Sequence, residues 1–352
     1  MIAPYMAVAL QTKVRHVTQR DDVALNLAHI ENMIDLVDHI CSLELPVRLI
    51  TTGEGAIQGF VDEILDMDQA EYADTMAAEV PGWETDRLGE KAKQKGCFIL
   101  GQLKTRNADF PGRFFNTVFL IDPRGEVVWQ HQKNIVLHVE HSTTPHDVYD
   151  DWIAKHGDGL DAFFPVAKTE IGNIAGTVGV EGAFPESYRA FALNGAEIMY
   201  RGSLPEPWVS REIFEVQNRA RAMDNTAYLL ANNTGTLIMP GPPGEAPTYV
   251  DGALGGRSAV YNYKGDVLTS STNVGDCYVA AEIDIEALRY YRENARFQNW
   301  APYLRTEIFQ KLYAEPIWPK NQPPQQLTDA DETFRGIVDK LIKRGTFTKS
   351  GY

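Results

Sequence analysis

Short apolar runs recur along most of the chain with helix-length segments between them, and this alternation constrains the fold more than any other feature. The apolar runs predict ten strands, at Tyr5–Gln11, Arg48–Thr52, Cys97–Gln102, Asn116–Ile121, Glu126–Gln132, Asn173–Val178, Ile198–Tyr200, Ala227–Asn232, Ser258–Tyr261 and Cys277–Ile283. The segments between them predict helices at Val23–Leu43, Asp86–Lys95, Pro185–Asn194 and Trp208–Asp224. Ten strands are too many for one small sheet. We therefore expect an α/β domain in which two stacked, mostly antiparallel sheets are covered by helices.

The turns and the chain's last part follow a different pattern. Asp122–Gly125 and Tyr261–Gly265 are predicted to be tight turns between paired strands, and the prolines and glycines of Pro240–Pro247 predict a loop. Arg289–Phe297 is predicted to be helical, and the prolines from Pro302 onward predict an irregular extension. We expect one domain over residues 1–285 and a C-terminal extension over residues 286–352.

Composition excludes several classes of function. The chain has 33 basic and 48 acidic residues, a net charge of −15, so nucleic acid and anionic membranes are not expected partners. The N-terminus lacks the basic start of a signal peptide, and three cysteines, Cys41, Cys97 and Cys277, favour a reducing cytosol. No Cys-x-x-Cys, His-x-x-x-His or Gly-x-Gly-x-x-Gly pattern is present, so neither a metal nor a nucleotide cofactor is expected.

Residues 171–186 are predicted to form a buried strand, a sharp turn and a helix. An α/β enzyme presents a nucleophile at such a place, at the carboxyl end of a strand. Gly179 stands at this turn, with Glu181 two residues on and Phe184-Pro185-Glu186 opening the helix.

Two other strand ends carry charged residues. Leu49-Ile-Thr-Thr-Gly-Glu54 is a strand that ends in a glutamate, before a glycine turn. The hairpin from Asn116 through Asp122–Gly125 ends in Gln132-Lys133, and His138-Val-Glu140 follows. Any one of these motifs is weak, but the three occur in a fixed order, each at a strand end.

Together the three motifs resemble the nitrilase superfamily, the carbon–nitrogen hydrolases that include nitrilases, aliphatic amidases and N-carbamoylases. The resemblance covers roughly residues 5–285 and implies a four-layer αββα sandwich that associates into homo-oligomers, in the cytoplasm, with the C-terminal extension at a subunit interface. A loosely packed surface tail is the alternative for that extension. The resemblance further implies that Glu54 is the general base, that Lys133 donates to an oxyanion, and that Glu140 orients Lys133.

At position 179 the resemblance implies a catalytic cysteine, and this chain has glycine instead. Glycine cannot form the thioimidate or thioester of the family's chemistry. No cysteine lies between Cys97 and Cys277, so a shift in register does not supply one. Thr177 faces the same side of the strand but lies about 7 Å away, which makes it a poor substitute.

Candidate substrate contacts surround this turn. Glu181 occupies a place where relatives carry an acidic residue, and we interpret it as site architecture. Phe184, Trp208, Trp83, Phe114 and the 234–255 loop are candidate pocket walls, although an aromatic side chain near such a turn is as often packing. Tyr200 and Arg201 either contact a polar group of the substrate or fill the strand end.

Three accounts of Gly179 remain open. A cysteine has been replaced to inactivate a hydrolase; or the enzyme works without a covalent intermediate, by hydrolysis, hydration, lyase or isomerase chemistry; or the protein is a non-catalytic small-molecule binder or scaffold. We expect an enzyme that acts on a small amide, nitrile or related carbonyl compound, because Glu54, Lys133 and Glu140 are all present and buried charges without a use are costly.

Overall fold

A computed structural model describes residues 1–60, 67–138, 140–203, 212–239, 241, 245–250, 255–325 and 327–352. Two six-stranded sheets dominate the fold. The strand order of the first sheet is β15-β1-β3-β4-β5-β6, with bounds β15 (Cys277–Ile283), β1 (Tyr5–Gln11), β3 (Val47–Thr51), β4 (Phe98–Arg106), β5 (Phe114–Ile121) and β6 (Val127–Gln132).

The second sheet repeats this layout in the order β14-β13-β10-β9-β8-β7. Its strands are β14 (Val267–Ser270), β13 (Ala259–Tyr261), β10 (Tyr228–Asn232), β9 (Ile198–Gly202), β8 (Gly172–Val178) and β7 (Ala167–Thr169). All ten predicted strands are confirmed, and the majority of their ends agree with the prediction to within one or two residues.

Both sheets are mixed, so the expectation of mostly antiparallel sheets was wrong for their centres. β1, β3 and β4 run parallel to one another, as do β8, β9 and β10, and antiparallel strands flank both groups. Parallel neighbours need a crossover connection, and helices supply it: α1 (Val23–Cys41), α4 (Trp83–Lys95), α7 (Pro185–Leu193) and α8 (Ile213–Asn225).

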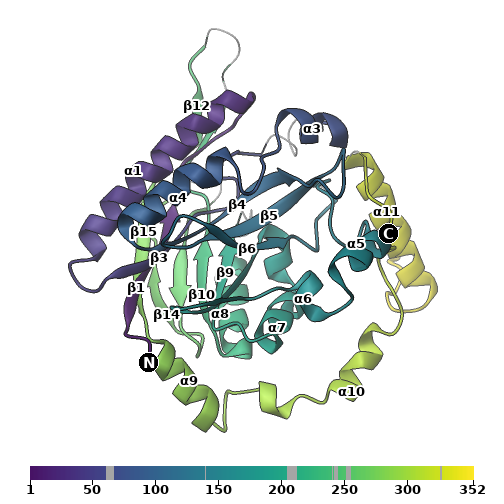
Figure 1. Ribbon diagram of the computed structural model, residues 1–352. Coiled ribbons are helices and arrows are strands. Elements are labelled where there is room, and N and C mark those ends of the chain that lie inside the picture. Colours follow the sequence, from purple (N-terminus) through teal and green to yellow (C-terminus); the bar gives the residue numbers. More distant parts are fainter. Residues whose placement is uncertain are drawn as a thin grey trace.

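The sheets stack face to face, and helices cover both outer faces (Figure 1). The helices α1, α3 (Gln69–Thr75) and α4 pack on the first sheet through one apolar cluster that includes Val8, Ile30 and Ile50. A second cluster fills the space between the sheets and continues under α7 and α8. The observed fold is therefore the four-layer αββα sandwich that was expected.

The inner face of the first sheet changes from apolar to polar along each strand. In β4, Phe98 and Leu100 belong to the core between the sheets, whereas Gln102 on the same face is a buried polar residue. Asn232 of β10 crosses between the sheets, where its amide donates to the carbonyl oxygen of Thr51 at 2.9 Å. The polar end of the interlayer space therefore lies where β3 ends, and the charged residues of interest gather there.

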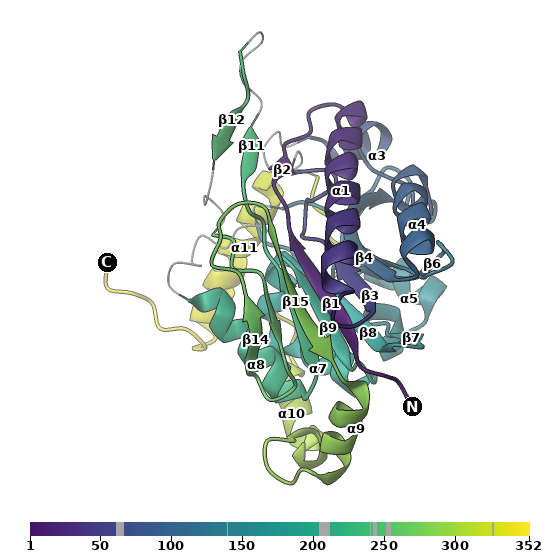
Figure 2. The ribbon, with the colours of Figure 1, turned by 90° about the vertical axis from the view of Figure 1, so that its left-hand side faces the viewer.

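Short elements that the pattern did not reveal lie outside the sandwich. β2 (Val14–Arg15), β11 (Leu237–Met239) and β12 (Thr248–Val250) form a small third sheet that stands above the sandwich (Figure 2). α5 (Tyr149–His156) and α6 (Leu160–Phe163) connect β6 to β7. These segments are short and give too few residues for a period to be recognised.

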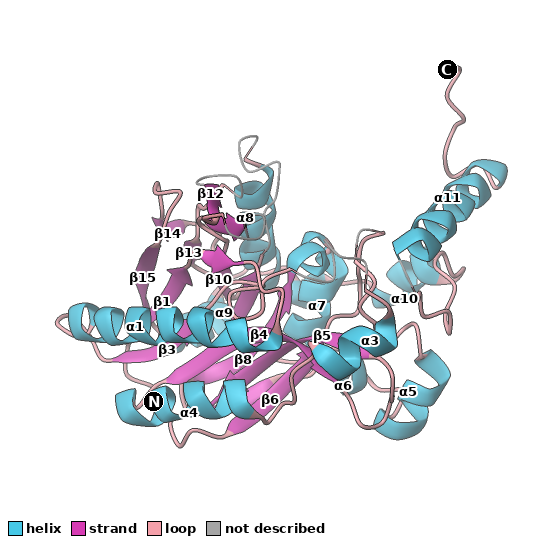
Figure 3. Ribbon diagram, turned by 90° about the horizontal axis from the view of Figure 1, so that it is seen from above, coloured by secondary structure: helices cyan, strands magenta, loops and turns pink. Residues whose placement is uncertain are grey.

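The C-terminal part is more regular than expected. α9 (Ile285–Asn294) and the single turn α10 (Thr306–Phe309) precede α11 (Leu327–Lys343), which lies beside the sandwich (Figure 3). The prediction of an irregular extension was wrong for α11. No proline follows Pro324, and Ala330, Phe334, Ile337 and Leu341 recur at helical spacing, a signal that the preceding prolines had obscured.

Candidate active site

Glu54 lies three residues beyond the end of β3, in a turn at the polar end of the interlayer space. Glu54 is 3% exposed. The turn is fixed from the neighbouring strand, because the backbone amide of Gly55 donates to Gln102 Oε1 at 2.8 Å. Gly55 has φ +69°, and a β-carbon there would lie 2.2 Å from the Phe60 ring. The turn that presents Glu54 therefore requires glycine at position 55.

Lys133 and Glu140 meet Glu54 from the segment that follows β6. The Lys133 ammonium donates to Glu140 Oε2 at 2.5 Å and to Glu54 Oε1 at 3.3 Å. Lys133 is 2% exposed and Glu140 is 6% exposed. Asn116 of β5 joins the two carboxylates, since its amide lies 3.0 Å from Glu54 Oε1 and 3.0 Å from Glu140 Oε1. We call Glu54, Asn116, Lys133 and Glu140 the charged cluster.

Lys133 and Glu140 of the charged cluster are ionised although they are buried. Burial alone lowers the pKa of Lys133, but the carboxylates of Glu140 and Glu54 outweigh burial and raise that pKa above its ordinary value. Burial alone raises the pKa of Glu140, but Lys104, Lys133 and the Asn116 hydrogen bond outweigh it and hold that pKa well below its ordinary value. Lys133 is therefore a cation and Glu140 an anion at neutral pH.

The strand–turn–helix predicted at residues 171–186 is confirmed. β8 ends at Val178, a short 3-10 turn spans Gly179–Ala183, and α7 starts at Pro185. Gly179 has φ +53°, and a β-carbon built on it would lie 2.7 Å from Glu54 Oε2 and 3.1 Å from Lys133 Nζ. Any side chain at position 179 would therefore point directly into the charged cluster.

Glu181 connects this turn to the segment after β6. Its carboxylate accepts from the backbone amide of Asn134 at 3.1 Å and from the Thr177 hydroxyl, and it lies 3.0 Å from His131 Nε2. Burial alone raises the pKa of Glu181, but His131 and these hydrogen bonds outweigh it and lower that pKa. The protein itself occupies both carboxylate oxygens, so the geometry suits Glu181 to a bracing role.

Tyr200 and Arg201 face opposite sides of β9. The Tyr200 hydroxyl donates to the carbonyl oxygen of Thr52, two residues before Glu54, at 2.6 Å. The Arg201 guanidinium packs on the other face, 3.0 Å from Asn218 Oδ1 and 4.9 Å from the centre of the Phe214 ring. Both side chains have protein partners, so their place as substrate contacts stays a prediction.

The aromatic candidates differ in position. Phe184 is 38% exposed at the start of α7, and Trp83 is exposed at the start of α4 under Arg87. Phe114 is fully buried, with its ring 5.9 Å from Lys104 Nζ. Trp208 lies outside the described residues, as do parts of the 234–255 loop.

Several members of the site had no role assigned from the sequence. Asn116 and Gln102 are linked at 2.8 Å, and Glu140 Oε1 also accepts from Ser142 at 2.7 Å and from Lys104 at 3.2 Å. One signal could have found two of them. Gln102 and Lys104 are polar residues two positions apart after an apolar run, which places them on one face of that strand near its end.

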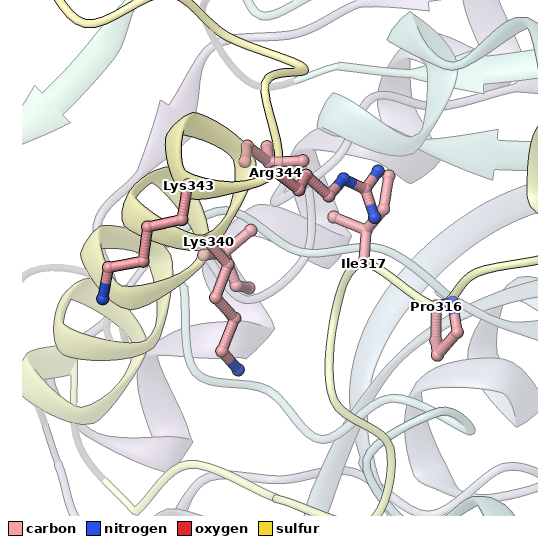
Figure 4. Close-up of a pocket in the computed structure, with 7 residues that line it drawn as sticks. Pro316, Ile317, Lys340, Lys343 and Arg344 are labelled. Carbon is pink, nitrogen blue, oxygen red and sulfur yellow. The ribbon is translucent and has the colours of Figure 1, made fainter.

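Other sites have less support. A surface cleft of about 420 Å³ lies between α11 and residues 316–317, and it shares no residue with the charged cluster (Figure 4). Within the described ranges, no three His, Cys, Asp or Glu side chains are grouped as metal ligands would be. No described helix has both the length and the apolar character needed to cross a membrane.

Solved structures place this sandwich in the class of nitrilase-type amidase folds. An amidase from Nesterenkonia sp. superposes with a TM-score of 0.61 and 18% identity, over 88% of this chain and 96% of that one. A variant of the Nesterenkonia amidase, which belongs to the nitrilase superfamily, holds the acetamide moiety of fluoroacetamide covalently at its active site cysteine.

The chain belongs to the carbon–nitrogen hydrolase family, whose profile matches residues 11–293. It is 27% identical over 252 residues to a beta-ureidopropionase from Arabidopsis thaliana, covering 70% of this chain and 59% of that protein. It is 33% identical over 156 residues to a formamidase from Bacillus cereus, covering 44% of this chain and 42% of that protein. The match thus spans about half the length of these relatives.

Proposed function

We propose that this protein is an enzyme that hydrolyses a small amide or a related carbon–nitrogen compound. Glu54 acts as the general base, Lys133 donates to the oxyanion, and Glu140 holds Lys133 in place. Position 179, where relatives of the family would carry a thiol, is left to a water molecule as the attacking nucleophile.

One observation carries this proposal: a β-carbon on Gly179 would point at both Glu54 and Lys133, at 2.7 and 3.1 Å. A nucleophile in that direction meets a base that can take its proton and a cation that can stabilise the negative charge formed on its target. Burying charged groups has a desolvation cost even when they are paired, so the presence of Lys133 and Glu140 as buried ions beside Glu54 supports a role for them in catalysis.

The chemistry follows from the geometry. A water molecule held by Glu54 gives up a proton to this carboxylate as its oxygen bonds to the carbonyl carbon. The carbonyl electron pair moves onto the carbonyl oxygen, where Lys133 donates a hydrogen bond. When the carbon–nitrogen bond breaks, the amine leaves with the proton from Glu54, so an amide and water yield a carboxylic acid and ammonia.

The relatives support the substrate class. A beta-ureidopropionase, a formamidase and an amidase differ in substrate, but all three names describe enzymes that act on amide-type carbon–nitrogen bonds. The Nesterenkonia amidase uses a cysteine, so either this chain follows a water route or it is a cysteine hydrolase that has lost its nucleophile.

Ammonia release separates these two routes. This chain, its Gly179→Cys variant and its Glu54→Gln variant are compared on a panel of short linear amides and nitriles. Turnover by the glycine form that disappears in Glu54→Gln supports the water route. Turnover by Gly179→Cys alone identifies a hydrolase without its nucleophile. If none of the three proteins releases ammonia from any compound of the panel, amide hydrolysis at this site is contradicted.

A second candidate is a small-molecule binder on the same fold, and glycine at position 179 is the observation that favours it. A binder would hold amides with the same affinity before and after Glu54→Gln, whereas an enzyme would lose turnover. Calorimetric titration of an amide into both forms measures the affinity, and ammonia release by the same two forms measures the turnover.

We also propose that the protein forms homo-oligomers in the cytoplasm and that residues 286–352 are an extension of a domain spanning residues 1–285. Large apolar side chains on α9 and the following segment support an interface, because they face solvent in the single chain: Tyr290, Phe297, Tyr303, Ile308, Leu312 and Ile317. Light scattering at micromolar concentration measures the assembly.

A further inference from the structure

Two buried amide side chains connect the turn that presents Glu54 to the carboxylates of the charged cluster. Gln102 and Asn116 are diagonal neighbours on one face of the first sheet, because Asn116 of β5 lies opposite Lys104 of β4, two residues beyond Gln102. Gln102 is 3% exposed and Asn116 is fully buried. Both amides therefore depend on hydrogen-bond partners within the protein.

The backbone fixes the direction in which the Gln102 amide points. A backbone N–H can only donate, so the Gln102 atom that lies 2.8 Å from the Gly55 nitrogen is the acceptor Oε1. Gln102 Nε2 then faces β5, where it donates to Asn116 Oδ1 at 2.8 Å. Because its oxygen is engaged in this way, Asn116 presents its NH₂ group to the carboxylates. We call the Gly55 amide and the side chains of Gln102 and Asn116 the amide relay.

The Asn116 NH₂ group donates one hydrogen bond to each carboxylate of the charged cluster. Its nitrogen lies 3.0 Å from Glu54 Oε1 and 3.0 Å from Glu140 Oε1. Glu54 Oε1 also accepts from Lys133 at 3.3 Å, whereas Glu54 Oε2 is the oxygen nearest to a β-carbon built on Gly179, at 2.7 Å. The hydrogen bond from Asn116 therefore holds the Glu54 carboxylate with Oε2 turned towards the position of the nucleophile.

We propose that Gln102 is a positioning residue of the candidate active site: it fixes the direction of the Asn116 amide, and through Asn116 it aims Glu54 Oε2 at position 179. This inference rests on the proposed function for the role of Glu54 as the base. Gln102 acts on the reaction through the direction of the amide relay, so its loss should slow the chemical step and leave substrate binding almost unchanged.

The first arm of the test needs no turnover and observes the Asn116 amide directly. Nuclear magnetic resonance follows the exchange of the Asn116 NH₂ protons with water in protein labelled with nitrogen-15 at asparagine, and Asn116→Ser identifies the signal by its loss. Gln102→Met replaces the amide with an apolar side chain of similar length, so Asn116 is free to rotate. We expect its NH₂ protons to exchange about threefold faster or more.

A second buried glutamine provides the matched control. Gln11 is fully buried in β1, and its amide donates to the carbonyl oxygens of Asn273 and Gly275 and accepts from the Ser258 backbone amide. None of these partners belongs to the charged cluster. Gln11→Met therefore removes a buried glutamine without touching the amide relay, and it should leave exchange at Asn116 unchanged.

The second arm separates positioning from a structural role. In whichever form turns over amides, the glycine chain or Gly179→Cys, Gln102→Met is expected to lower kcat about tenfold, the scale of one hydrogen bond lost in the transition state. KM should stay within about twofold of the parent value, because binding that is lost equally from substrate and transition state would raise KM instead. Gln102→Asn shortens the side chain by one methylene and is the milder variant if Gln102→Met does not fold.

The outcomes are distinct. Faster exchange at Asn116 in Gln102→Met or Gln102→Asn, with a lower kcat at constant KM, supports the proposal. Exchange that matches the Gln11→Met control overturns the amide relay. A raised KM at constant kcat, or a loss of kcat no larger than that of Gln11→Met, overturns the positioning role. If no form turns over any amide, the proposed function fails, and the exchange arm still decides whether Gln102 fixes the Asn116 amide.

Discussion

The two sheets contribute unequal halves to the candidate site. From the first sheet come Glu54, Asn116, Lys133 and Glu140, four buried side chains within hydrogen-bonding distance of one another. The second sheet contributes the turn at Gly179, which aims at this cluster and carries no side chain. The first half therefore supplies the charged cluster, and the second half supplies the Gly179 backbone and the bracing carboxylate of Glu181.

This difference shows which interactions stabilise each half of the site. The charged cluster is mutually dependent, since each carboxylate is balanced by Lys133 or by an amide donor, and the loss of one member would expose the rest to the cost of burial. The turn at Gly179 is held by the backbone and by Glu181, neither of which needs the residue 179 side chain. A nucleophile can therefore disappear from this site without disturbing the acid–base groups.

Glu54→Gln is expected to have the largest effect on catalysis. In whichever of the glycine form and Gly179→Cys turns over amides, kcat/KM falls roughly 10²–10⁴-fold, because the amide side chain cannot accept the proton of the nucleophile. Steady-state ammonia release measures the loss. Glu90→Gln, at an exposed position on α4, is the matched control and keeps full activity. Equal turnover in Glu54→Gln and the parent would show that the cluster does not perform the proton transfer.

Lys133→Met is expected to destabilise the fold by about 3–5 kcal/mol, since it removes the cation that contacts both buried carboxylates and leaves Glu140 paired with Lys104 alone. Urea unfolding followed by circular dichroism measures this loss. Adding Glu140→Gln to Lys133→Met should restore part of the stability, because the uncompensated carboxylate is removed as well. Strictly additive losses in the double variant would mean that Lys133 and Glu140 do not depend on each other.

The sequence predicts the two halves of the candidate site better than it predicts the C-terminal extension, residues 286–352. Strand positions and the place of Glu54, Lys133 and Gly179 at strand ends follow from the apolar runs. The hydrogen bonds of Asn116 do not, because a buried amide in a strand has the same local pattern whether it points at a core or at a site. α11 was missed because five prolines precede it, and whether Tyr200 faces Thr52 depends on the packing of β9 between its neighbours.

The pH dependence of stability should test the ionised state of the charged cluster. Glu140 has a folded-state pKa below its ordinary value of 4.5, so its ion pair adds stability that is fully present above that pH and is lost as the pH falls through the folded-state pKa. The difference in unfolding free energy between the parent and Glu140→Gln should therefore be constant from pH 7 to 5 and shrink below about pH 4.5. Urea unfolding at pH 7, 5, 4 and 3 measures it. A difference that stays constant down to pH 3 would contradict a lowered pKa at Glu140.

The smallest expected effect lies on the turn itself, and a second glycine of this chain isolates it. Gly179→Ala should cost about 1–2 kcal/mol for a left-handed backbone, and more because its β-carbon would lie 2.7 Å from Glu54 Oε2. Gly96, which caps the C-terminus of α4 with φ +65°, has no atom within 4 Å of a β-carbon built on it. Gly96→Ala should therefore lower the free energy of unfolding only through its left-handed backbone. The excess loss in Gly179→Ala over Gly96→Ala, measured by urea unfolding, reports the contact between position 179 and the charged cluster. Equal losses would mean that Glu54 moves aside freely, and the turn would then accept a cysteine side chain at no cost beyond the backbone.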